Sequence, residues 1–141
     1  MSQASDYLEQ VVCDIITGRR PVPSAAATNR WLSLHTANPA DDASGTEVSG
    51  TSYARQQITN STGPVYSFPA ASGTGGSVTN STAAVTFPAA GGSWGTVTHF
   101  AYWDASSGGN MLAHGALGAS QAINTGNVLQ FNTSTLTVTV A

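Results

Sequence analysis

Lysine is absent from this sequence, and charged residues of every kind are few. Four arginines and seven acidic residues make up 8% of the chain and give a net charge of −3, whereas an average globular domain carries roughly 25% charged residues. No basic patch is available to neutralise phosphates, so nucleic-acid binding is not expected. Small and hydroxyl-bearing residues take the place of charge, which favours a β-rich chain whose surface is solvated by serine and threonine.

Cysteine is represented by Cys13 alone, which excludes an internal disulfide and a thiolate metal cluster. No apolar stretch approaches the length of a membrane span, and no basic region followed by an apolar run resembles a secretory signal. We therefore expect synthesis in a cytosol, no membrane association and no cofactor. A chain of 141 residues suits a single domain with its own hydrophobic core.

One amphipathic helix is predicted over residues 1–18. Ser5 is a candidate N-cap, and Gly18 is placed to end the helix. We expect the apolar stripe to pack on the chain's own sheet, with a partner subunit as the alternative. The apolar positions recur with helical spacing: Tyr7, Leu8, Val11, Val12, Ile15 and Ile16.

The remainder of the chain indicates a change of architecture. Residues 1–20 form a helical arm, residues 21–30 form a linker with two prolines, and residues 31–141 form a β domain. Many short strands separated by Gly, Pro and Asn turns predict a mainly β, jelly-roll-like antiparallel sandwich. The expected strands are 31–36, 53–59, 65–68, 75–80, 83–87, 96–104, 111–117, 127–131 and 135–140, with a polar loop at 38–52.

The segment TVTHFAYWD, residues 96–104, carries aromatic residues on both faces of the predicted strand. Val97 and Trp103 alternate onto one face, and Phe100 and Tyr102 onto the other. A strand of a two-layer sandwich buries one face. The second apolar face therefore has to be covered by the N-terminal helix or by another subunit, which indicates an interaction protein.

The stretch GGSWG, residues 91–95, matches the Gly-x-Ser-x-Gly elbow of serine hydrolases. Asp104 and His114 follow Ser93 in the order of that catalytic triad. An elbow requires a strand before the serine and a helix after it, but here a strand follows. We interpret the stretch as a loop with Trp94 as a packing anchor, and we predict no catalytic residues.

Other side chains suggest metal sites that the spacing does not support. His35, His99 and His114 lie on three predicted strands and would hold zinc only if they converged. Asp41, Asp42 and Glu47 share one loop but lack a calcium-binding spacing. We predict no metal site.

Five segments, in the same order, resemble a family of small tailed-phage proteins that are commonly called phage tail fibre proteins. The most specific parts are LHTANP, EVSG…YAR and VTHFAYWDA-SGGN. The resemblance covers nearly the whole chain and implies a virion structural protein with a β-sandwich and no enzymatic activity. The matching segments are SDYLEQVVCDIITG, WLSLHTANPADD, GTEVSGTSYARQQIT, AAVTFPAAGGSWGTVTHFAYWDASSGGNMLAHGAL and NVLQFNTSTLTVTV.

Within the virion, we prefer a capsid cement protein that clamps neighbouring subunits, because the chain has no repeats or coiled-coil stalk. The expected partners are further copies of the chain and the phage major capsid protein. A tail fibre or tail-tip protein that binds host glycans through Trp31, Trp94 or Trp103 is the alternative. The predicted interface residues are Leu8, Val11, Val12, Ile15, Phe100 and Tyr102.

Overall fold

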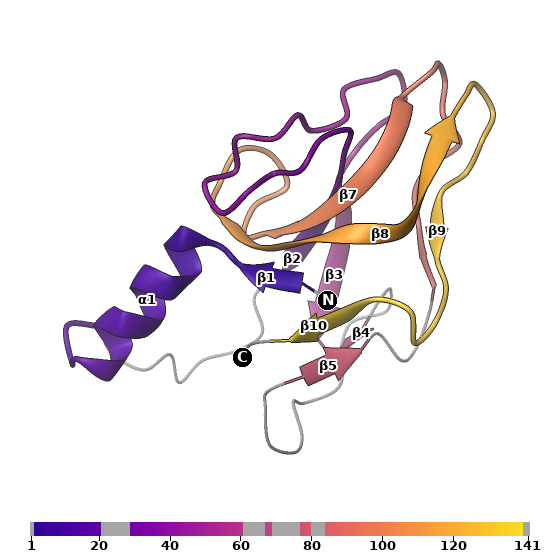
Figure 1. Cartoon of the computed structure of the whole chain (residues 1–141). Coiled ribbons are helices and arrows are strands. Elements are labelled where there is room, and N and C mark those ends of the chain that lie inside the picture. Colours follow the sequence, from indigo (N-terminus) through magenta and orange to yellow (C-terminus); the bar gives the residue numbers. More distant parts are fainter. Residues whose placement is uncertain (1, 21–28, 61–66, 69–76, 80–83, 140–141) are drawn as a thin grey trace.

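The computed structural model describes residues 2–20, 29–60, 67–68, 77–79 and 84–139 (Figure 1). Within these described ranges, one helix and ten strands occur in the order β1, α1 and then β2 to β10. Most of the predicted linker, residues 21–28, lies outside the described residues. In the part that is described, no helix has the length and apolar character needed to cross a membrane.

The N-terminal segment begins with a strand, β1 (Ser2–Ala4), and continues into the helix α1 (Asp6–Ile16). Ser5 caps the helix, because its Oγ accepts a hydrogen bond from the Leu8 N–H at 3.3 Å. Thr17 is the C-cap, and Gly18 takes a left-handed φ of +75° just beyond it, as the sequence predicts. The expectation that the helix starts at residue 1 is wrong, because residues 2–4 pair with the edge of β8.

The main layer is a six-stranded sheet in the order β1-β8-β7-β2-β3-β4. Its pairs are antiparallel except for β3 with β4, which is parallel. Two two-stranded antiparallel sheets, β6 with β9 and β5 with β10, complete the fold. The remaining strands are β2 (Arg30–His35), β3 (Gln56–Asn60), β4 (Ser67–Phe68), β5 (Ser77–Thr79), β6 (Val85–Thr86), β7 (Gly95–Trp103), β8 (Met111–Ile123), β9 (Gln130–Phe131) and β10 (Thr137–Thr139).

The main core lies between the large sheet and the smaller strands, so the fold is a sandwich with one broad and one narrow layer. Leu32, Leu34 and Phe100 supply the sheet side, and Phe87 and Leu129 supply the opposite side. Leu32, Leu34 and Phe87 are at most 1% exposed. The prediction of a mainly antiparallel β fold with one helix near the N-terminus is confirmed.

A register shift in β7 changes which face Val97 occupies. The β7–β8 pairing jumps from Val97 with Gln121 to His99 with Ala116. A bulge of this kind breaks the strict alternation of side chains along a strand. Val97 therefore joins the core of Phe100 and Tyr102, and its predicted placement beside Trp103 is wrong.

Candidate functional site

The helix α1 offers an apolar face that the described part of the chain leaves uncovered. No residue of α1 is buried. Leu8, Val11 and Ile15 are half-buried, whereas Val12 is 40% and Ile16 is 78% exposed. The helix projects from one end of the β domain and meets it near β8 (Figure 1). The expectation that this stripe packs into the chain's own core is wrong.

The base of α1 is nevertheless held firmly. Ser5 is 1% exposed, and its Oγ donates to the carbonyl oxygens of Met111 and Leu112. The Ser5 N–H also donates to the Leu112 carbonyl at 3.0 Å, and the Asp6 N–H donates to Asp41 at 3.2 Å. These bonds fix the start of the helix to β8 and to the loop that contains Asp41.

The two other predicted interface residues lie elsewhere. Phe100 and Tyr102 are each 6% exposed inside the main core. Their rings make an edge-to-face contact at 5.8 Å, and Phe100 makes a second one with Phe131 at 5.8 Å. Both rings therefore have partners within the chain, and their predicted part in an interface stays a prediction.

The second aromatic face of β7 is covered by the chain itself. Trp103 is 8% exposed and packs with Ala101, Met111, Trp31 and Ala43. Ala43 belongs to the loop that the sequence marks as polar, which folds back over this face. The inference that the helix or another subunit has to cover it is wrong.

Arg55 lies against Trp103 and links the loop to the neighbouring turn. The Arg55 guanidinium lies 3.9 Å from the centroid of the Trp103 ring and donates two hydrogen bonds to Glu47, at 2.8 and 2.7 Å. It also donates to the carbonyls of Ala105 and Gly108 at 3.0 and 2.8 Å. The Arg55 side chain is 7% exposed, so this is a largely desolvated, bidentate ion pair. Two of the segments on which the family resemblance is most specific, EVSG…YAR and VTHFAYWDA-SGGN, therefore meet in one structural cluster.

The pKa values of Glu47 and His35 are set by burial and by the contacts with Arg55. Burial alone would raise the pKa of Glu47, but the hydrogen bonds and charge of Arg55, with the Tyr53 hydroxyl, lower it overall. Burial lowers the pKa of His35, the Glu47 carboxylate and a hydrogen bond with Gly45 partly raise it, and the Arg55 charge lowers it further. The Glu47 carboxylate is thus held charged, and the His35 imidazole is held neutral.

The hydrolase-like residues do not assemble. Ser93 and Asp104 flank opposite ends of the nine-residue strand β7, a separation of roughly 30 Å at the usual rise per strand residue. Ser93 Oγ accepts from the Gly95 N–H at 3.3 Å. Asp104 accepts from the backbone and side-chain nitrogens of Asn110 at 2.7 and 2.8 Å, which closes a turn. The His114 Nε2 atom lies 3.0 Å from Asp41 Oδ1, so its hydrogen-bond partner is Asp41 rather than Ser93 or Asp104.

The three histidines share a sheet face but have separate partners. His35 pairs in register with His99, and His114 follows on the next strand. His35 Nε2 bonds with Ser33 at 2.8 Å, and His99 Nδ1 bonds with Thr98 at 2.8 Å. Within the described ranges, no three His, Cys, Asp or Glu side chains form a group able to hold a metal ion.

The three acidic residues of the loop do not form a common calcium site, because each has a different partner. Asp41 bonds with His114, Glu47 accepts from Arg55, and Asp42 accepts from the Ser44 N–H at 3.0 Å. Of the three tryptophans considered for glycan stacking, Trp94 and Trp103 are buried and Trp31 is half-buried. Trp94 is 4% exposed and donates to the Thr51 carbonyl at 3.1 Å, as expected of a packing anchor.

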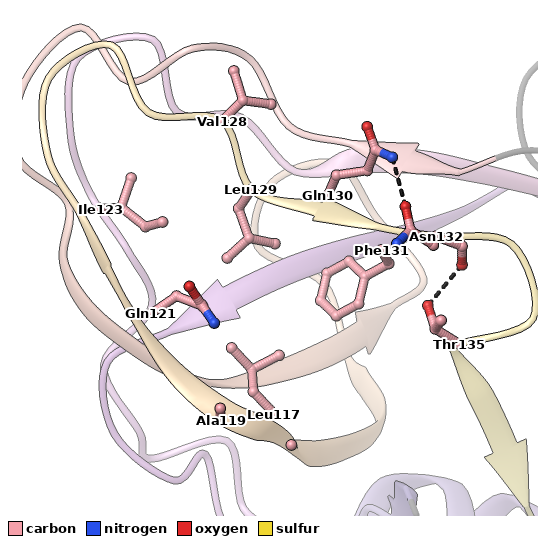
Figure 2. Close-up of a pocket in the computed structure, with 11 residues that line it drawn as sticks. Leu117, Ala119, Gln121, Ile123, Val128, Leu129, Gln130, Phe131, Asn132 and Thr135 are labelled. Atoms are coloured by element: carbon pink, nitrogen blue, oxygen red, sulfur yellow. Dashed lines mark hydrogen bonds between the residues drawn. The ribbon is translucent and has the colours of Figure 1, made fainter.

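A pocket that sequence reasoning missed lies between β8 and β9 (Figure 2). Its volume is about 600 Å³. It forms where β8 continues beyond its predicted end at residue 117 to Ile123. The small residues at 118–120 show no strand-like apolar pattern, so the sequence does not predict that this part of the chain lines a pocket. The lining residues are Leu117, Gly118, Ala119, Gln121, Ile123, Val128, Leu129, Gln130, Phe131, Asn132 and Thr135.

Comparison with known proteins gives the family of this chain. A search of curated proteins finds no match. Residues 3–139 match the family model Gp80, described as "Podophage GP4 fiber I protein gp80". Since this match spans almost the entire sequence, the chain belongs to the Gp80 family of podophage fibre proteins and is a structural component of a phage virion.

Proposed function

We propose that this protein is a fibre subunit that attaches to a second copy of itself through the apolar face of α1. The observation that carries the proposal is the lack of any buried residue in a helix with a continuous apolar stripe. Exposed apolar faces of this kind mark protein–protein contacts. The role is non-enzymatic, which agrees with the dispersal of Ser93, Asp104 and His114.

Charge placement on α1 supports a second copy as the partner. Asp6 and Glu9 lie in the first turn of the helix, and Arg19 and Arg20 follow its last turn. Two α1 helices packed antiparallel would bring each acidic end beside the other helix's basic end. Such complementarity fixes the register of an apolar contact more than it adds affinity.

The α1 contact is tested by a charge placed on either face of the helix. In Val12→Asp, an aspartate enters the apolar stripe, so we expect loss of self-association with little change in melting temperature. Gln10→Asp adds the same charge on the opposite, exposed face and serves as the control. Sedimentation equilibrium of the three proteins measures the outcome.

Two results would contradict this contact. A wild-type protein that stays monomeric at every concentration would remove the self-association. A Val12→Asp protein that unfolds would show that the residue stabilises the monomer instead.

Capsid cement is the second candidate function, with the phage major capsid protein as an additional partner. It is favoured by the compact β domain and by the lack of a coiled-coil stalk among the described residues. The family description favours the fibre. Quantitative mass spectrometry of virions separates the two: a few copies that match tail symmetry support the fibre, whereas hundreds that match the capsid subunits support cement.

A further inference from the structure

The pocket between β8 and β9 combines an open apolar floor with a polar rim. Phe131 is half-buried and is anchored from below by edge-to-face contacts with Phe100 and Phe87, at 5.8 and 6.5 Å. Val128 is 51% exposed at the upper edge, and Leu117 is half-buried on the β8 wall. Figure 2 shows these side chains around the hollow, so a ligand would meet apolar carbon surface on more than one side.

The rim is built from amides and a hydroxyl, and part of it is already ordered. Gln130 Nε2 donates to Asn132 Oδ1 at 2.7 Å, while Thr86 Oγ1 donates to Gln130 Oε1 at 3.2 Å. Thr135 Oγ1 donates to the Asn132 carbonyl at 2.6 Å. The Gln121 amide stands on the opposite wall, formed by β8 (Figure 2). Preordered hydrogen-bonding groups reduce the entropy cost of binding a ligand.

The lining of this pocket carries no charge. None of its lining residues is ionisable, and from Gln56 to the last residue Asp104 is the only Asp, Glu, Lys or Arg. Asp104 follows the C-terminal end of β7, whereas Gln121 and Ile123 pair with Val97 and Gly95 near its other end. A charged ligand would lose hydration here without gaining a counter-charge, which is unfavourable.

The geometry points to a site for a neutral saccharide. A sugar ring presents hydroxyl groups at its edge and C–H groups on its faces, which match the amide rim and the apolar floor. The pocket volume falls in the range of about 300–1,000 Å³ that is typical of small-molecule sites. The inference goes beyond the proposed self-association, because it concerns a different surface and holds whether or not α1 pairs.

The ligand class is tested on the purified full chain with matched sugars. We would record amide chemical shifts by NMR while adding glucose, galactose, mannose, rhamnose or N-acetylglucosamine at millimolar concentrations. Glucuronic and galacturonic acids serve as the charged counterparts. We expect at least one neutral sugar to shift the amides of Gln121 and Phe131, and the acids to shift neither.

A pair of neighbouring variants locates the binding. Gln121→Ala removes an exposed amide from the pocket wall, and we expect about fivefold weaker binding, equivalent to one lost hydrogen bond. Ser120→Ala alters the adjacent exposed residue of β8, which does not line the pocket, and should bind as the wild type does. The proposal is overturned if no neutral sugar shifts any amide, if the shifts map outside the pocket, or if the acids bind equally well.

Discussion

Arg55 joins parts of the chain that are far apart in the sequence. Its guanidinium contacts Glu47, the ring of Trp103 and two carbonyls of the turn between β7 and β8. Removal of one partner from a desolvated ion pair leaves the other charge without compensation, which costs more than the pair itself contributes. A side chain at this position therefore controls whether the loop stays over Trp103.

Arg55→Ala should lower the free energy of unfolding by about 2–3 kcal/mol, the magnitude expected for loss of one partner of a mostly buried pair. Urea denaturation measures the change. Arg19→Ala is the matched control, since Arg19 pairs with Asp14 at 3.7 Å with its own side chain 80% exposed, and such pairs contribute about 0–1 kcal/mol. Equal effects of the two substitutions would contradict the structural role of Arg55.

At the scale of elements, Ser5 has two structural roles in the N-terminal segment. Ser5 caps α1 and also attaches it to β8 through Met111 and Leu112. The helix contributes no buried residue to the core, so its position depends on this short attachment and on the pairing of β1. The helix can therefore loosen without unfolding of the sheet.

Ser5→Ala should increase hydrogen exchange in α1 selectively. The substitution removes the cap and the two bonds from the Ser5 hydroxyl to β8, while the backbone bond from Ser5 to Leu112 remains; the loss of an N-cap costs about 1 kcal/mol. Hydrogen-exchange mass spectrometry compares peptides from α1 with those from β7. An equal increase in both would show that Ser5 stabilises the whole fold rather than the attachment of the helix.

Local patterns in the sequence were sufficient to predict most elements but not their partners. The helical spacing from Leu8 to Ile15 and the alternation in β2 are properties of neighbouring residues, and both elements form. The strand β1 was missed because three residues carry no periodic signal and form a strand only against β8. The extension of β8 past Leu117, and hence the pocket, depends on pairing with β7, for which residues 118–120 offer no apolar pattern.

At the scale of the whole molecule, the two histidines whose pKa falls on folding lie on one side of the sheet. His35 faces Glu47, Arg55 and His99, and burial lowers the pKa of both His35 and His99. A histidine with a lowered pKa takes up a proton more readily in the unfolded chain. Proton binding in that state therefore favours unfolding as the pH falls.

We expect the free energy of unfolding to be constant between the ordinary histidine pKa of 6.5 and the ordinary tyrosine pKa of 10.0, above which the raised pKa values of Tyr53 and Tyr102 favour unfolding. It should decrease as the pH falls from 6.5 through the lowered folded-state values of the histidines. A further decrease should follow below the ordinary pKa of 4.5 for Glu47, as the pH approaches its lowered value. Urea titrations across this range test the profile. His35→Asn should flatten the first decrease, and an unchanged slope would assign it to other groups.

The near absence of charge after Gln56 has a consequence for adsorption in different media. Dissolved ions weaken contacts between charges over a Debye length of about 10 Å at 0.1 M, and they have no such effect on neutral hydrogen bonds. The side chains that line the pocket carry no charge for ions to screen. If the pocket binds a neutral sugar as proposed, that binding should be as strong in brine as in dilute buffer, so a particle that used it would bind the same sugar in fresh and in saline water.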